Sequence, residues 1–234
     1  MKRKRILDSY QTVYVILVGI VILELIGSVI SAILATDSGM RDASISNIFL
    51  SMLAIVLFSI PWIIESRFKI DIPNYIEILV LIFLFCSIVL GNIHGFLLNI
   101  KGYDKILHTV SGITISIIAF EMIHFYNKSR QSVDRMNPGI MAIFAFTFSM
   151  TLLVLWEFYE FAIDTISYNF NHDTLRNMQR YQWENSSLYF PQDYGLMDTM
   201  LDLVVGAIGS IIVSFVGWRV IVHHQNLKNN EVKG

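Results

Sequence analysis

Six apolar runs long enough to cross a bilayer recur along the chain, at about 12–35, 45–64, 75–93, 106–125, 138–163 and 195–222. A membrane-spanning helix needs about 20 predominantly apolar residues, and each run meets or approaches that length. Short connectors separate the first five runs, which predicts that neighbouring helices pack antiparallel. The pattern therefore predicts an all-α polytopic bundle of six transmembrane helices, forming a single membrane domain over residues 1–234.

The one long connector covers residues 165–194 and mixes polar with aromatic side chains. Its aromatic residues are Tyr168, Phe170, Tyr181, Trp183, Tyr189, Phe190 and Tyr194. Aromatic side chains with polar neighbours are typical of the headgroup layer of a membrane. Two hypotheses remain open for this segment: a lid that covers a nearby site, or an interfacial loop that anchors the helices.

Composition supports a membrane protein. Hydrophobic residues make up 54% of the 234 residues and charged residues 15%, whereas soluble domains carry about 25% charge. Lipid must therefore solvate most of the apolar surface. A net charge of −2 without a long basic run argues against a nucleic-acid partner. The single cysteine, Cys86, excludes a disulfide framework and a thiolate metal cluster.

The distribution of basic residues predicts the orientation of the spans. With the N-terminus inside the cell, twelve of the seventeen Lys and Arg residues fall on cytoplasmic segments. The five on outer segments are Arg41, Lys101, Lys105, Arg176 and Arg180. This bias predicts that both termini are cytoplasmic and that the long connector is extracytoplasmic.

Ionisable residues concentrate in the last three spans, although each costs on the order of 2.5–3.5 kcal/mol at mid-bilayer. They are Asp104 and His108 in the fourth run, Glu157, Glu160 and Asp164 in the fifth, and Asp198 and Asp202 in the sixth. Spacings of three, four and seven residues return to one side of a helix. Each of the three helices therefore presents one acidic face.

The depths of these residues also agree. At about 1.5 Å per residue, His108, Glu157 and Asp202 are each expected about 6–10 Å inside the outer end of their helix. Gly206 and Gly209 remove side-chain bulk next to Asp202, which lets another helix approach closely. The three helices are therefore expected to line one shallow cavity on the extracytoplasmic side.

So many carboxylates cannot share a small cavity while all are ionised, so some stay protonated or a cation neutralises them. Carboxylates with histidine form the ligand sets of Zn, Mn, Fe or Mg sites. We predict a divalent metal ion, of unknown identity, bound by Asp104, His108, Glu157, Glu160 and Asp202. Asp164 and Asp198 are then candidates for a catalytic general base or a second-metal ligand.

A structural alternative stays open for part of this set. Asp104 and Asp198 lie near helix starts, where a carboxylate interacts favourably with the helix dipole. His108 can also be a neutral core histidine that bonds to Asp104 one turn back. In the first three spans the notable ionisable residues are Glu24, which has no evident partner, and His94, which suits the layer of the acidic cavity.

Three segments resemble a known family: DKILHTVSG from Asp104 to Gly112, WEFYEFAID from Trp156 to Asp164, and GLMDTMLDL from Gly195 with GAIG ending at Gly209. They look like the YjdF-like family of bacterial inner-membrane proteins, from about Pro73 onward. A more distant resemblance links the Asp104, His108 and late Gly-Ala-x-x-Gly pattern to VanZ-like proteins. The resemblance implies a bacterial plasma membrane location and supplies no reaction.

Three functions fit these features. The first is a metal-dependent enzyme, embedded in the membrane, that acts on a lipid or lipid-linked envelope substrate at the outer leaflet. The second is a cation- or proton-coupled transporter that uses the same carboxylates. The third is a non-catalytic envelope protein whose polar helices hold the bundle together. Because the inner halves of the helices are nearly wholly apolar, the sequence favours a site open to one side only.

Overall fold

The computed structural model describes residues 9–128, 136–171, 178–180 and 192–231, and every regular element within these ranges is a helix. Six helical segments there are long and apolar enough to cross a membrane. They are Tyr10–Leu34, Ser38–Phe68, Asn74–Ile93, Tyr103–Asn127, Pro138–Asn169 and Tyr194–Leu227. The predicted all-α chain with six spans is confirmed, whereas the orientation of the termini stays a prediction.

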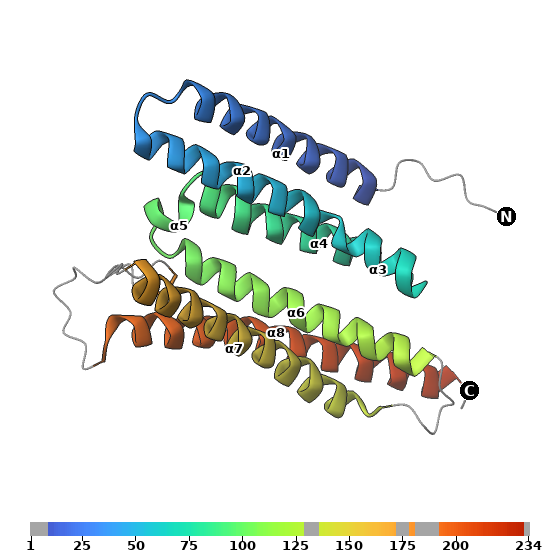
Figure 1. Cartoon of the computed structure of the whole chain (residues 1–234). Helices are drawn as coiled ribbons and strands as arrows, with labels where there is room; N and C mark the ends of the chain where they lie inside the picture. The colour runs from blue at the N-terminus through green and yellow to red at the C-terminus, as the bar shows by residue number, and fades with distance from the viewer. Residues whose placement is uncertain (1–8, 129–135, 172–177, 181–191, 232–234) are drawn as a thin grey trace. The chain divides into compact units, whose positions relative to one another are not determined.

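The chain divides into two compact units, residues 1–103 (unit 1) and 104–234 (unit 2). The single domain expected from the sequence therefore also stays a prediction. Unit 1 contains α1 (Ser9–Leu34), α2 (Ser38–Phe58), α3 (Ile60–Phe68), α4 (Asn74–Leu84), η1 (Phe85–Ile93) and α5 (Phe96–Asn99) (Figure 1). Its core consists of fully buried apolar side chains: Val21, Ala54, Phe58, Leu81 and Val89.

The second span begins at Ser38, earlier than the apolar pattern predicts, because Asp37 caps the helix. One carboxylate oxygen of Asp37 accepts a hydrogen bond from the Met40 amide at 3.0 Å, which satisfies an otherwise unpaired donor of the first turn. The span then breaks at Ser59, between α2 and α3. Pro61 lies in the first turn of α3, where its missing N–H costs no helical hydrogen bond.

The second half of the third span is a π-helix, η1. Its backbone hydrogen bonds reach five residues back, as in the bond that the His94 amide donates to the Val89 carbonyl at 2.9 Å. In addition, the Asn92 side chain donates to the Ser87 carbonyl at 3.0 Å. The His94 side chain, just past η1, lies 3.0 Å from Glu24 Oε1. Glu24 therefore has a partner within unit 1 that the sequence did not identify.

Unit 2 is built from three long helices: α6 (Tyr103–Lys128), α7 (Pro138–Asn171) and α8 (Tyr194–Glu231), which lie side by side (Figure 1). Helix α7 continues to Asn171, past the predicted start of the outer loop at residue 165. Of that loop, residues 172–177 and 181–191 lie outside the described residues, including Tyr181, Trp183, Tyr189 and Phe190.

Glycines bring α6 and α8 into close contact. A Cβ atom added to Gly112 on α6 would collide with the carbonyl oxygen of Gly206 on α8, and one added to Gly209 would collide with the carbonyl oxygen of Thr109. Small residues of this kind allow membrane helices to approach backbone to backbone. The acidic face of α8 is thereby held directly against the face of α6 that carries His108.

Candidate functional site

The first turns of α6 supply three polar side chains to the candidate site. Asp104 lies in the first turn, where the positive end of the helix dipole stabilises a carboxylate. Lys105 follows it, and His108 lies one turn further along the same face. The His108 side chain is 6% exposed and that of Asp104 is 22% exposed. The site therefore runs from the end of the helix into its buried interior.

Helix α8 supplies Asp198 and Asp202, which are four residues apart and so share one face. Their side chains are 1% and 0% exposed. A buried carboxylate is costly unless it is paired or hydrogen-bonded. The structure must therefore provide a partner for both, and it does so from α6.

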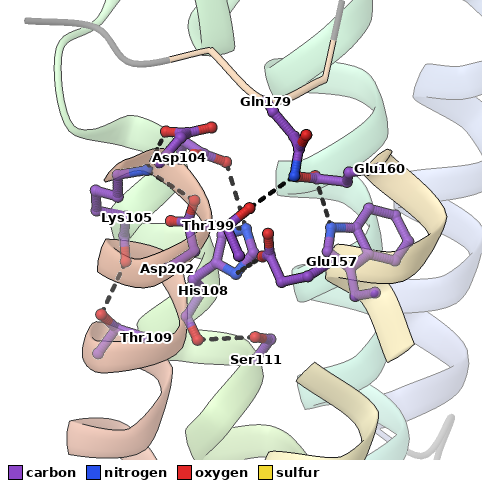
Figure 2. A network of polar contacts seen from close by, with 12 residues as sticks. Asp104, Lys105, His108, Thr109, Ser111, Glu157, Glu160, Gln179, Thr199 and Asp202 are labelled. Atoms are coloured by element: carbon purple, nitrogen blue, oxygen red, sulfur yellow. Dashed lines mark hydrogen bonds and ion pairs between the residues drawn. The ribbon is translucent and has the colours of Figure 1, made fainter. Parts of the chain in front are cut away.

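That partner is the ammonium group of Lys105, which lies among three carboxylates (Figure 2). Its Nζ atom is 2.5 Å from Asp198 Oδ1, 2.7 Å from Asp202 Oδ2 and 3.2 Å from Asp104 Oδ2. The sequence alone identifies Lys105 only as a basic residue of a predicted outer segment. A cation was expected in this cluster, and the chain supplies one itself.

His108 lies between carboxylates on both edges of its ring. Its Nε2 atom is 3.6 Å from Asp104 Oδ1 and 3.8 Å from Asp202 Oδ1, and its Nδ1 atom is 3.8 Å from Glu157 Oε1. N–H···O hydrogen bonds are typically about 2.7–3.2 Å long, so all three of these distances are too long for hydrogen bonds. The predicted alternative, a His108 that simply bonds to Asp104, therefore does not describe this geometry.

Three oxygen atoms around His108 are buried without a hydrogen-bond partner among the described residues. They are Asp202 Oδ1 and both carboxylate oxygens of Glu157. Buried polar atoms in folded proteins are nearly always paired, with protein, water or an ion. One ligand atom from each of Asp104, His108 and Asp202 lies within 4.8 Å of the others, a grouping that suits a metal ion.

Two of the predicted site residues have other partners. Glu160 is buried, and its Oε1 atom accepts a hydrogen bond of 2.8 Å from the indole N–H of Trp156 one turn earlier. The two carboxylate oxygens of Asp164 accept the backbone amides of Met178 and Gln179, each at 2.9 Å. The three residues that can share an ion do not include Glu160 or Asp164.

The short segment 178–180 is tied to the ends of both α7 and α8. Besides the Asp164 contacts, the Gln179 side chain donates to the Thr199 hydroxyl at 2.6 Å. Figure 2 shows Gln179 reaching from this segment toward the cluster beside Glu157. Thr199 directly follows Asp198, so part of the outer connector is anchored next to the buried carboxylates. The lid and anchor hypotheses for the whole connector both stay open.

Residues 13–223 match the profile of a family described as a predicted membrane protein, DUF2238. The chain belongs to this family. DUF2238 is the YjdF-like family, so the resemblance carried by the three sequence segments is confirmed. No curated protein and no solved structure matches the chain. The VanZ-like resemblance stays a prediction, and family membership together with six spans makes the chain a multi-pass membrane protein.

Proposed function

We propose that this DUF2238 protein is a metal-dependent enzyme embedded in a bacterial plasma membrane, with both termini in the cytoplasm. Its site faces the extracytoplasmic side and acts on a lipid or lipid-linked envelope substrate. Metal ligation is assigned to His108 Nε2, Asp104 Oδ1 and Asp202 Oδ1. The observation that carries the proposal is the convergence of these three atoms without a hydrogen bond between them.

The spacing of the three atoms fits a shared ion better than a hydrogen-bonded cluster. Donors around a tetrahedral ion at 2.0–2.1 Å are about 3.3–3.4 Å apart. The two separations from His108 Nε2, 3.6 and 3.8 Å, need only a few tenths of an ångström of closure to reach that geometry, and the two carboxylate oxygens lie within 4.8 Å of each other. One imidazole with two carboxylates suits Zn, Mn or Fe, and with added water also Mg.

The surrounding residues orient these donors. Lys105 binds the second oxygen of both Asp104 and Asp202, which leaves Oδ1 of each directed to His108. Glu157 faces the opposite nitrogen of the ring, Nδ1, at 3.8 Å. Histidine ligands usually donate their second ring N–H to a carboxylate, and Glu157 is the carboxylate on that side of the ring, although at 3.8 Å the two are not hydrogen-bonded in this structure. Glu157 is therefore assigned an orienting role and not the direct ligation expected from the sequence.

A proton acceptor is also available. A bound divalent ion would polarise a substrate oxygen or activate water. Of the carboxylates first considered for the base, Asp198 holds Lys105 and Asp164 holds backbone amides. Neither carboxylate oxygen of Glu157 has a hydrogen-bond partner among the described residues. We therefore assign Glu157 Oε2 as the proton acceptor and leave Asp198 as the residue that positions Lys105.

A lipid or lipid-linked substrate suits the environment of the site. One face of helix α7 is an open apolar surface, formed among others by Met150, Val154, Leu155 and Phe158. Phe158 directly follows Glu157 in the chain, so this exposed surface and the buried proposed base lie on different faces of the same turn. An acyl chain packed along this surface would bring its headgroup toward the end of the helix.

The test is metal content, measured by mass spectrometry on full-length protein purified in detergent. We expect one ion per chain in the wild type and its loss in Asp202→Asn and His108→Ala. Glu160→Gln is the matched control, because its carboxylate bonds to Trp156 and lies outside the ligand set. Variants are compared only when they elute as folded protein.

A folded wild type without metal, or metal retained in both ligand variants, would overturn the metal centre. Turnover is then followed by lipid mass spectrometry, with metal-loaded protein in nanodiscs of bacterial polar lipid extract and His108→Ala as the inactive control. Unfolding of every site variant would instead favour the non-catalytic alternative.

One observation favours a transporter as the second candidate. Fully buried hydroxyl groups continue inward from the cluster along all three helices of unit 2: Ser116, Ser149 and Ser210. The inner half of this unit is therefore more polar than the apolar sequence pattern indicates. Protein reconstituted into liposomes with an imposed pH gradient distinguishes the two: cation uptake that requires Asp202 favours transport, and its absence favours an enzyme.

A further inference from the structure

A second polar layer lies in the interior of unit 2, on the inward side of the carboxylate cluster. The hydroxyls of Ser149 on α7 and Ser210 on α8 are 2.7 Å apart. Both also lie near the carbonyl oxygen of Gly112 on α6, at 3.2 and 3.3 Å. Gly112 has no side chain to shield this oxygen, so one carbonyl serves all three helices.

Two further hydroxyls in this interior have no hydrogen-bond partner among the described residues. They belong to Ser116, which is fully buried, and Ser214, which is 7% exposed. A buried helical hydroxyl normally donates to the carbonyl four residues back, as Thr114 does to Val110 at 2.8 Å. For Ser116 that carbonyl belongs to Gly112, whose oxygen lies within hydrogen-bond distance of Ser149 and Ser210 instead, each of which has one proton to donate.

The register between α6 and α8 places Ser116 and Ser214 at the same level. Lys105 contacts Asp202, 97 residues later, and Gly112 contacts Ser210, 98 residues later. Ser116 and Ser214 also differ by 98, so they follow the Gly112–Ser210 contact by one helical turn on each helix.

On α7, which runs antiparallel to both, the residue one turn inward of Ser149 is Ala145, which is fully buried. The residues at this level on the three helices, Ser116, Ser214 and Ala145, therefore all have small side chains.

We propose that Ser116 and Ser214 bind one small ligand that is held by neutral oxygens, either a water molecule or a Na⁺ ion. Both bind to hydroxyl and carbonyl oxygens, and both would satisfy the two unpartnered groups. A buried water typically makes about three such bonds in a polar site with enough room. Hard cations likewise take oxygen ligands, including backbone carbonyls.

This site is separate from the proposed metal centre, because none of its residues is a ligand of that centre. A ligand bound by Ser116 and Ser214 would add a second polar site to unit 2, further along the helices from the carboxylates. The serine site does not depend on the metal centre, so it can hold a ligand even if the metal proposal fails. The two proposals are also tested with different variants.

The experiment measures the melting temperature of full-length protein in detergent for Ser116→Ala, Ser214→Ala and the double variant. Thr114→Val is the control, because its hydroxyl bonds within its own helix. A shared ligand predicts that each single variant melts about 2–4 °C lower. It also predicts that the double variant melts no lower than the worse single variant, because both remove the same ligand.

The ligand is identified by replacing NaCl with choline chloride at equal ionic strength. A melting temperature that falls in choline for the wild type, but not for the double variant, supports Na⁺. No salt dependence, together with the non-additive losses, supports water. If the serine variants melt at the same or a higher temperature, or if their losses add, the proposal is overturned, since an empty site gains from losing an unpaired hydroxyl.

Discussion

Lys105 is expected to be the residue whose neutralisation destabilises unit 2 most. Lys105→Met keeps the length of the side chain but removes the ammonium group that three carboxylates share at 2.5, 2.7 and 3.2 Å. Two of those carboxylates, on Asp198 and Asp202, are at most 1% exposed, and Lys105 itself is 13% exposed. Water therefore cannot replace the lost partner.

Removing one member of a buried ion pair costs about 3–5 kcal/mol, because the other charge stays buried without compensation. We expect a loss of that order for Lys105→Met. For a chain of this size it corresponds to a melting temperature lower by about 6–20 °C. Lys105→Arg keeps the charge and is expected to lose less.

The assay is thermal unfolding of the full-length protein in detergent with a chelator present, so that no metal ion replaces the ammonium group. Lys101→Met is the control, because Lys101 is exposed in the connector before α6. The double variant Lys105→Met with Asp198→Asn is expected to be more stable than Lys105→Met alone, since it removes one of the uncompensated carboxylates. A loss below about 1 kcal/mol for Lys105→Met, within the range of exposed pairs, would refute the reasoning.

Three further results are expected. Gly112→Ala places a methyl group against the backbone of α8 and should lower stability by about 1–3 kcal/mol. Gly19→Ala is the control, because open space surrounds Gly19. Equal melting temperatures for the two variants would contradict the close approach of α6 and α8. Asp164→Asn weakens two charge-assisted bonds to segment 178–180, so trypsin cleavage after Arg180 should become faster; an unchanged rate would exclude this anchoring. Glu24→Gln changes one partner of the half-exposed contact with His94 and should cost less than about 1 kcal/mol by thermal unfolding; a larger loss would show that lipid desolvates this contact.

The sequence predicts the spans and much of the cluster because both follow from helical periodicity. Runs of about 20 apolar residues suffice to find the six helices, and spacings of four place Asp198 with Asp202 and Asp104 with His108 on common faces. All of these residues come together in unit 2, as the depths of the three helices suggested. Periodicity shows which face of its own helix a residue occupies, and this is sufficient to predict which acidic residues share a face.

The remaining features depend on which helix lies beside which. Lys105 was counted as an outer basic residue because its neighbours on α8 are almost a hundred positions away. Glu160 is a different case, because its partner Trp156 lies four residues earlier on the same helix. Periodicity shows that these two side chains are neighbours but not that they bond to each other. The start of α2 was missed for a different reason, since a capped polar first turn lies outside an apolar run.

The π-helix η1 makes the direction of His94 depend on the number of residues before it. Each hydrogen bond there spans five residues, so η1 holds more residues per turn than an α-helix would over the same rise. Deleting one residue between Phe85 and Ile93 would convert part of the segment to α-helix and change the direction in which the imidazole points from the helix axis. The contact between His94 and Glu24 is thus sensitive to a change in chain length that would leave the hydropathy of the span unaltered.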